Sequence, residues 1–424
     1  MTILAFVVGI VVLVIGLAIS IALHEVGHLV PAKAFGVRVG QYMIGFGPTL
    51  FSWRRGETEY GFKALPLGGY ISMAGMYPPA PGAETTPRRA SSRFFSTLVQ
   101  DARAANEETL IGAGDRTFYR LSMWKRIVIM LGGPFMNLLL AIVLFAILFS
   151  GIGVQTASST VGSLSACVPA SATASDASEC APGQTPAQRA GLQEGDVIVS
   201  IDGTSTADFA EASAIIQQSA GRTLTFVVER GGAERTLSVT PTAVPSSDGA
   251  DVGFVGFRPT SEFVRQPIWV GPQAAFENVG AVAGIIWQLP VKIVEAGATL
   301  FTGEERDPNG PLSVVGAGVI AGEVASSDAP VLNRVAGMIG LLGSLNIALF
   351  VFNLVPLLPL DGGHVVVALW DGIKRAWARL FSRPAPKPVD ATRLVPFTMV
   401  VFVALVVMGG TLILADLFNP VSLL

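Results

Sequence analysis

The sequence contains a pentapeptide, His24-Glu25-Val26-Gly27-His28, whose residue types and spacing suit a metal site. On a helix, residues four apart lie on one face, so both imidazoles can bind a single Zn²⁺. Glu25 lies about 100° around the helix from His24 and can act as general base toward a metal-activated water. The pattern therefore predicts a metal-dependent hydrolase with Zn²⁺ as its cofactor.

The segment before the pentapeptide places it inside a membrane. Residues 3–23 carry no charged side chain and are long enough to span a bilayer. Ionisable side chains at that depth are energetically costly and usually mark function. We therefore interpret the pentapeptide as half of a candidate intramembrane metalloprotease site.

A catalytic zinc site usually has three protein ligands, so two histidines are not sufficient. The third and last histidine, His364, lies in the segment NLVPLLPLDGGH at 353–364. Pro356 and Pro359 are expected to break the helix, which is tolerated at membrane depth only where backbone is buried in protein or lines a wet cavity. Asp361 follows the break and is the favoured third ligand. His364 is the alternative ligand, although a supporting role beside the metal suits it better.

Composition and charge predict a polytopic α-helical membrane protein with about four transmembrane helices. The 424 residues are 51% hydrophobic and 14% charged, and their mean hydropathy is +0.57. A net charge of −3 gives no indication of nucleic-acid binding. The high hydropathy makes the lipid bilayer the expected partner. Basic residues gather before residue 126 and at 374–393, whereas 153–188 contain none. The positive-inside rule then places both termini outside and the two basic loops in the cytoplasm.

Residues 281–300 are a candidate for a fifth span. Lys292, Glu295 and the proline between the two halves of this segment favour an amphipathic or packed helix instead. A fifth span would also carry Asp361 to the face opposite His24, roughly 30 Å away. Because both are candidate ligands of one metal, we predict four spans.

Two further regions have a β pattern. Residues 57–73 read as strand, turn and strand, with the bend at Gly68 and Gly69, whereas 78–115 read as a flexible cytoplasmic insert. Residues 190–203 (AGLQEGDVIVSIDG) resemble the core of a PDZ domain, a module that binds chain ends or extended segments by strand addition.

The segment 163–188 interrupts the expected first strand and binding loop of this domain and contains both cysteines, Cys167 and Cys180. We favour a role as a steric filter for substrates, with peptide capture or a purely structural role as the alternatives. A Cys167–Cys180 disulfide is open at this point and requires an oxidising compartment.

Five motifs occur in order along the chain: HEVGH at 24–28, GFGP at 45–48, PLGGY at 66–70, GPFMN at 133–137, and the segment from Asn353 to Gly363. Together they resemble the site-2 protease family of intramembrane zinc metalloproteases, specifically its bacterial, actinobacterial-like group with a PDZ domain. The resemblance implies roles for six residues: His24, His28 and Asp361 as zinc ligands, Glu25 as catalytic base, and Asn353 and Asn346 as substrate-binding residues. Hydrogen bonding between helices is the alternative for both asparagines and the role we expect for Asn137.

The expected organisation has seven parts: 1–33, transmembrane helix 1 with HExxH; 34–126, a cytoplasmic loop with the β-hairpin region; 127–152, transmembrane helix 2; 156–242, the PDZ domain; 243–335, an extracytoplasmic or amphipathic helical region; 336–372, transmembrane helix 3 with the LDGG motif; and 394–418, transmembrane helix 4.

By this resemblance the protein is an intramembrane zinc endopeptidase of the bacterial inner membrane. Its PDZ domain would be extracytoplasmic and its active site would lie toward the cytoplasmic side. The expected substrates are transmembrane segments of single-span membrane proteins, such as pre-cut anti-sigma factors in regulated intramembrane proteolysis. The alternatives are clearance of remnant signal peptides by the same chemistry, and a non-catalytic PDZ membrane scaffold with structural zinc.

Overall fold

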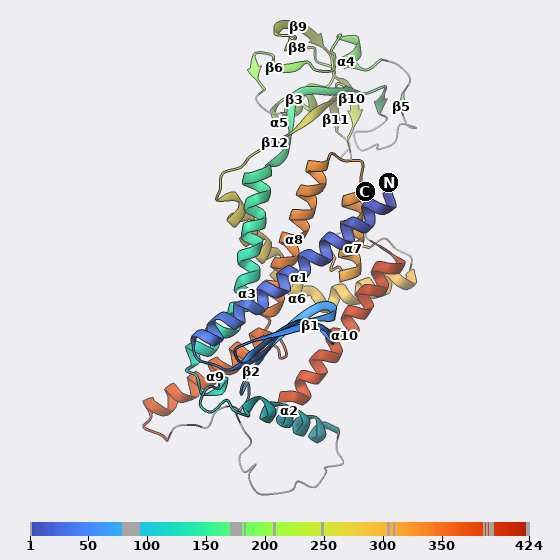
Figure 1. Ribbon diagram of the computed structural model, residues 1–424. Helices are drawn as coiled ribbons and strands as arrows, with labels where there is room; N and C mark the ends of the chain where they lie inside the picture. The colour runs from blue at the N-terminus through green and yellow to red at the C-terminus, as the bar shows by residue number, and fades with distance from the viewer. Residues whose placement is uncertain are drawn as a thin grey trace. The chain divides into compact units, whose positions relative to one another are not determined.

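The computed structural model describes residues 2–78, 94–169, 180–181, 184–206, 209–246, 250–302, 306–307, 310–384, 386, 389 and 394–420. The chain divides into two compact units, shown with the order of their elements in Figure 1. Unit 1 comprises Met1–Ser150 and Pro267–Leu424, and unit 2 comprises Gly151–Gln266.

Unit 1 is built around long apolar helices. Within the described residues, five helices are long and apolar enough to cross a membrane. They are α1 (Thr2–Ala34), α3 (Met123–Ala146), α6 (Val270–Thr302), α8 (Val331–Asn353) and α10 (Val395–Phe418). Their outward side chains are apolar too, and on α1 Val11 and Ile15 are about half exposed. Such exposed apolar faces are expected of helices that contact lipid, so the chain is a multi-pass membrane protein.

The number of spans depends on α6. Residues 281–300, which we predicted to be an amphipathic or packed helix, form its second part, and α6 as a whole is long and apolar enough to span. Helix length therefore does not confirm four spans. At its start α6 lies beside the end of α3, where Gly271 contacts Ala146.

The helices after α6 have defined directions. Helix α7 (Val314–Ser326) runs antiparallel to α1, and α8 runs parallel to it. The contacts that define these directions are Gly9–Ala321 and Leu13–Ala317 for α7, and Gly16–Leu342 and Ser20–Asn346 for α8. The start of α6 and the end of α7 thus lie on the face of unit 1 where α1 begins.

The predicted span at 336–372 is wrong as a single element. In the structure α8 ends at Asn353, and a separate helix, α9 (Asp361–Leu380), begins at Asp361. Pro356 and Pro359 lie between the two helices and cannot donate the backbone hydrogen bonds that would continue α8. The loop also folds onto the first turn of α9, where a Cβ on Gly362 would lie 2.4 Å from the carbonyl oxygen of Leu354.

Two long antiparallel strands, β1 (Val39–Arg55) and β2 (Thr58–Met73), form a sheet in unit 1 (blue in Figure 1). Residues 41–44 of β1 pair with 59–62 of β2 and also with 69–72, one set on each side. The bend predicted at Gly68 is where β2 changes from one alignment to the other, and Gly68 has a φ of 135°. The prediction missed β1, whose glycines and polar residues conceal the alternation of a strand.

Part of the predicted flexible insert is helical. Residues 79–93 lie outside the described residues, but α2 spans Phe94–Leu110. Its alanine, leucine and glutamate residues favour a helix. The Asn106 amide accepts a hydrogen bond from the backbone N–H of Tyr77 and donates one to its carbonyl oxygen, at 3.2 and 2.9 Å. The helix is therefore attached to the end of β2. Short helical turns occur at Phe118–Arg120 (η1), in unit 1, and at Ile147–Ile152 (η2), where the chain passes from unit 1 into unit 2.

Unit 2 is a β-rich domain with one main sheet. Its strand order is β12-β3-β6-β8-β9, with β7 paired to β6. The strands are β3 (Val154–Leu164), β6 (Val197–Ile201), β7 (Thr204–Ser205), β8 (Leu224–Arg230), β9 (Ala233–Val239) and β12 (Phe257–Val264), and the helices are α4 (Pro186–Arg189) and α5 (Phe209–Gln217). Phe226 and Leu224 are fully buried in its core.

The domain extends beyond the predicted boundary of 242. Strands β10 (Thr242–Pro245) and β11 (Asp251–Phe254) pair with each other, and β12 pairs with β3 from one end to the other. Unit 2 therefore continues to Gln266, and β12 forms an edge of its main sheet, whereas β10 and β11 form a separate two-stranded sheet. The short strands β4 (Val168–Pro169) and β5 (Cys180–Ala181) also pair, and Cys167 is disulfide-bonded.

Candidate metal centre

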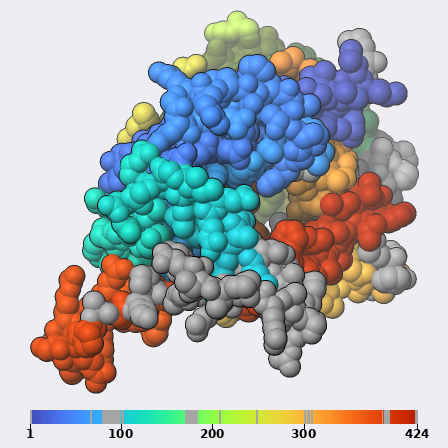
Figure 2. All heavy atoms as spheres, turned by 60° about the horizontal axis from the view of Figure 1, so that its bottom comes forward, coloured from blue at the N-terminus to red at the C-terminus, as the bar shows by residue number. Residues whose placement is uncertain are grey.

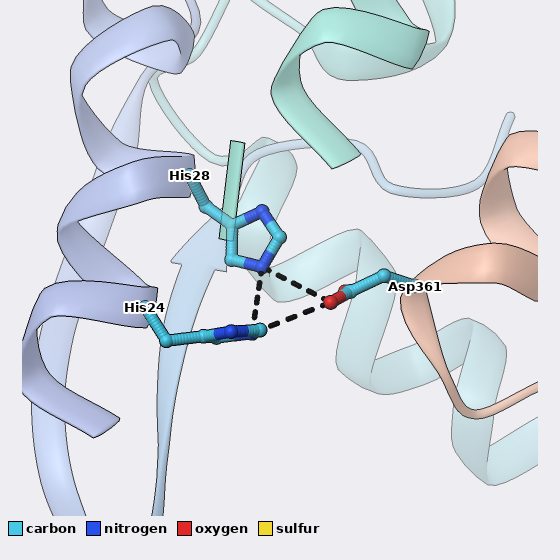
Figure 3. A group of neighbouring side chains, drawn as sticks. All are labelled: His24, His28 and Asp361. Carbon is cyan, nitrogen blue, oxygen red and sulfur yellow. Dashed lines mark hydrogen bonds and ion pairs between the residues drawn. The ribbon is translucent and has the colours of Figure 1, made fainter. Parts of the chain in front are cut away.

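Three side chains from distant parts of the chain converge in unit 1 (Figure 3). His24 and His28 project from one face of α1, and Asp361 is the first residue of α9. The Nε2 atoms of the two histidines are 3.2 Å apart. Asp361 Oδ2 lies 3.3 Å from His24 Nε2 and 3.4 Å from His28 Nε2. Two ring nitrogens and one carboxylate oxygen therefore face a common point.

These spacings fit a tetrahedral metal ion. With metal–ligand bonds of about 2.0–2.1 Å, tetrahedral ligand atoms are separated by roughly 3.3–3.4 Å. The buried Asp361 Oδ2 has no hydrogen-bond partner, which is costly for a carboxylate unless a cation compensates it. A nitrogen–nitrogen–oxygen donor set is also one that Zn²⁺ prefers.

A glycine on α3 keeps space open beside these atoms. A Cβ at Gly133 would lie 2.2 Å from His28 Nε2 and 2.7 Å from His24 Nε2. Any larger residue would therefore collide with the two ligand atoms. The absence of a side chain is what lets a metal fit against α3.

Helix α3 also orients both imidazoles. His28 Nδ1 lies 2.7 Å from the carbonyl oxygen of Ile129, which requires a hydrogen on Nδ1. The Nε2 lone pair of His28 then points toward Asp361. On the other ring, His24 Nδ1 lies 3.2 Å from the side-chain amide of Asn137. Sequence reasoning expected only helix packing from Asn137, and its contact with His24 was missed.

The Asn137 amide satisfies the site better when it is turned. With Nδ2 toward His24, its buried Oδ1 has no hydrogen-bond partner. Amide nitrogen and oxygen are nearly indistinguishable in shape, so the hydrogen-bond network decides their assignment. A half-turn places Oδ1 toward His24 Nδ1, where it accepts the Nδ1 hydrogen and leaves the Nε2 lone pair for a metal. Both histidines then present the same tautomer.

Close backbone contact explains how α3 reaches both rings. A Cβ on Gly27 would lie 2.1 Å from the carbonyl oxygen of Gly132, and one on Gly132 would lie 2.0 Å from that of Gly27. Glycines at such crossings let two membrane helices approach without side chains between them. A glycine pair inside an apolar segment was the sequence signal that could have located this crossing.

The position of α9 is secured by an internal ion pair. Arg126 Nη1 on α3 lies 3.0 Å from Asp371 Oδ2, and both side chains are buried. This contact lies about three turns along α9 from Asp361. It ties the helix that carries the candidate carboxylate ligand to the helix that orients the histidines.

Glu25 lies between the histidines and the β-sheet. It is buried on α1, and a Cβ on Gly69 of β2 would lie 2.9 Å from its Cγ. Residues 69–72, on the part of β2 that pairs with β1 on one side only, are therefore next to the candidate base.

The structure does not bring every predicted residue to the centre. Asn346 is fully buried and donates to Ser20 Oγ at 3.0 Å, which connects α8 with α1. Asn353 donates to Leu349 within its own helix. His364 packs against Tyr77, with ring centroids 6.3 Å apart, and is outside the metal-ligating group found among the described residues.

A histidine pair on an apolar helix, joined by a distant aspartate and a neighbouring glutamate, defines a membrane-embedded zinc metalloprotease of the site-2 type. The chain belongs to peptidase family M50, whose model matches residues 12–384. It is 34% identical over 442 residues to zinc metalloprotease Rip1 of Mycobacterium tuberculosis, covering 99% of each chain. It is also 29% identical over 389 residues to metalloprotease MmpA of Caulobacter vibrioides, covering 88% of each. The protein is thus a zinc metalloprotease.

Proposed function

We propose that His24, His28 and Asp361 bind the catalytic zinc and that Glu25 is the catalytic base of an intramembrane endopeptidase. The observation that carries this assignment is the convergence of three ligand atoms 3.2–3.4 Å apart beside Gly133. The membership in family M50 agrees with it.

The residues around the centre divide the chemistry between them. Bound zinc would polarise the scissile carbonyl and make a water more acidic. Glu25 takes a proton from that water and passes it to the leaving amine. Asn137 and the Ile129 carbonyl hold the two imidazoles with Nε2 toward the centre. Asn353, at the end of α8, is proposed to donate to the developing negative charge once its amide turns away from the carbonyl oxygen of Leu349.

The substrate segment is proposed to bind as an added strand. A transmembrane helix conceals its peptide bonds in backbone hydrogen bonds, so it must unwind before cleavage. Residues 69–73 of β2 pair only with β1 among the described residues, which leaves their other edge available. Because Gly69 adjoins Glu25, a strand added there would pass the base.

The substrates are proposed to be single-span membrane proteins that an earlier cut has shortened outside, such as anti-sigma factors. The proposed location is the bacterial inner membrane, with four full crossings by α1, α3, α8 and α10. Support comes from α6 and α7, which begin and end on the same face of unit 1. The active site is then nearer the cytoplasm, and unit 2 is outside.

Unit 2 is proposed to be a PDZ domain that filters substrates by size. The motif at 190–203, the buried core under β6 and β8, and an edge strand, β12, support this assignment. A bulky external domain on a substrate would collide with it. A shortened substrate would not.

The decisive experiment is Glu25→Gln in the full chain, with Glu295→Gln on α6 as the matched control. Loss of a general base should lower cleavage of a pre-cut single-span substrate by about 10²–10⁴-fold. Zinc content should stay at the level of the unmodified protein, and the control should cleave normally. Normal cleavage by Glu25→Gln would refute the assignment. The substrates that the inactive variant retains in cells would separate anti-sigma factors from remnant signal peptides.

A further inference from the structure

Helix α9 has an apolar face that no described residue covers. Its exposed side chains lie along one side and include Val366, Trp370, Ile373, Trp377, Leu380 and Phe381. The opposite side contains buried Ala368, Asp371 and Ala378 and packs against α3. In Figure 2, α9 is the orange group that projects at the lower left. The helix is therefore packed on one side and open on the other.

A groove runs between α9 and the segment that follows it. Its volume is about 420 Å³, within the range of ligand sites. The apolar lining includes Trp370, Ile373, Trp377, Pro384 and Pro386, and Lys374 and Arg383 line the groove as well. Two tryptophans, two prolines and two cations therefore surround one apolar space.

Two cationic side chains, Lys374 and Arg383, line this groove. The carboxylate of Asp371 has several partners. It accepts hydrogen bonds from Arg126 Nη1 at 3.0 Å and from the backbone N–H of Val389 at 2.9 Å. It also lies 3.2 Å from Lys374 Nζ. Arg383 has no ion-pair partner among the described residues, so a negative ligand would be attracted here.

We propose that this groove binds an anionic phospholipid, with an acyl chain along the tryptophans and the phosphate between Lys374 and Arg383. Tryptophan together with lysine and arginine is the composition of helices that lie in a membrane interface. The groove also belongs to a helix that is separated by seven residues from α8, one of the apolar helices, so lipid is within reach. We assign this lipid to the cytoplasmic leaflet, and that assignment alone rests on the proposed topology.

The lipid would act on the first turn of the same helix. Asp361 begins α9, and the groove lies two to four turns farther along. A helix held in the membrane interface keeps its first residue at a constant depth. Lipid binding would therefore maintain the alignment of Asp361 with the histidines of α1.

The test is native mass spectrometry of the full chain titrated with phosphatidylglycerol and, separately, with phosphatidylcholine. The unmodified protein should bind phosphatidylglycerol more tightly. The double variant Lys374→Gln/Arg383→Gln should lose affinity for it by about fivefold for each charge. Trp370→Ala/Trp377→Ala should weaken binding of the same lipid. The control Arg235→Gln/Arg258→Gln, which removes two exposed charges of unit 2, should bind as the unmodified protein does.

Equal affinity for the two lipids, or unchanged binding by Lys374→Gln/Arg383→Gln, would overturn the proposal. So would a dimer that dissociates in the tryptophan variant, because a second copy would then occupy the groove. Zinc content identifies variants that have not folded. Because neither lipid affinity nor zinc content measures cleavage, this result is independent of the Glu25→Gln test.

Discussion

Two acids of the apolar unit 1, Asp416 and Asp361, have different surroundings. Asp416 on α10 is closed in by the chain itself: Arg306 pairs with Oδ1, and the backbone N–H groups of Ser313 and Gly316 donate to Oδ2 at 2.7 and 3.1 Å. Asp361 faces two imidazole nitrogens, and its Oδ2 has no hydrogen-bond donor.

A glycine creates the space in both places, for different occupants. A Cβ on Gly316 would lie 2.5 Å from the carboxylate of Asp416, so this glycine admits the acid itself. Gly133 adjoins no acid but keeps open the point toward which three ligand atoms are directed. The two acids thus differ in how their charge is compensated. Asp416 is neutralised by its own chain, whereas Asp361, the proposed metal ligand, needs an added cation.

The largest effect should come from breaking the internally closed site. Asp416→Asn leaves Arg306 buried without a counter-charge, which should cost about 3–5 kcal/mol of stability. Thermal unfolding of the detergent-solubilised protein measures it, and the folded fraction should still bind zinc. The double variant Asp416→Leu/Arg306→Met should regain most of the loss. If the double variant were as unstable as the single one, the closed-pair interpretation would fail.

Asp361→Asn should have the opposite effect: it should lower zinc affinity and leave the stability of the metal-free protein intact. Structural zinc sites of four ligands bind with about 10–16 kcal/mol, so one ligand contributes about 2.5–4 kcal/mol, or roughly 10²–10³-fold in affinity. Competition with a chelator measures this change. Stability without metal should not fall, because the uncompensated carboxylate is gone. One zinc per chain at unchanged affinity would contradict the ligand assignment.

Asn137→Leu tests the hydrogen bond that orients His24. Loss of such a partner should lower zinc affinity by about 10–100-fold. Asn137→Asp keeps an acceptor at Oδ1 and should restore binding. Asn278→Leu on α6, which removes another amide from an apolar helix, should leave zinc affinity unchanged. A defect of equal size in Asn137→Asp would mean that packing, not the acceptor, is what matters.

The smallest effect concerns Asp196, an acid of unit 2 that is paired with Arg230 at 2.6 and 2.7 Å. Burial raises the pKa of Asp196, but the hydrogen bonds from Arg230 and from the backbone N–H of Gln193, together with the charges of Arg230 and Arg235, outweigh it and lower the pKa below its usual 3.8. The stability that this pair contributes is present above that pH and is lost as the pH falls through the lowered pKa. Hydrogen exchange of β6 and β8 should show this acid sensitivity, and Arg230→Gln should reduce it. Equal pH dependence in both proteins would contradict the pairing.

The sequence allowed the catalytic chemistry to be predicted more fully than the elements that support it. His24 and His28 are recognisable because helical spacing puts them on one face, and Asp361 because it follows two prolines in an apolar segment. Helix α9 was missed because its apolar side reads as a continuation of α8. The sequence alone does not say that this side is left open.

The contacts of Asn137 could not be predicted from local patterns. Asn137 is more than 100 residues from His24, and their contact depends on the crossing of α1 and α3 at Gly27 and Gly132. Likewise, the pairing of β1 with two parts of β2 is a long-range arrangement. Periodicity reports which side of an element is apolar, but not which element it meets.

The two parts of the candidate site are far apart in the sequence, and this separation matters while the protein is being synthesised. His28 and Asp361 are separated by more than 330 residues of chain. At about 5–20 residues per second, synthesis takes roughly 15–70 s to travel from one to the other. Throughout that interval the nascent chain already carries HExxH in the membrane beside other newly inserted helices, yet it has no complete ligand set. With the proposed ligand set, the zinc site is therefore incomplete, and the protease inert, until Asp361 has been made.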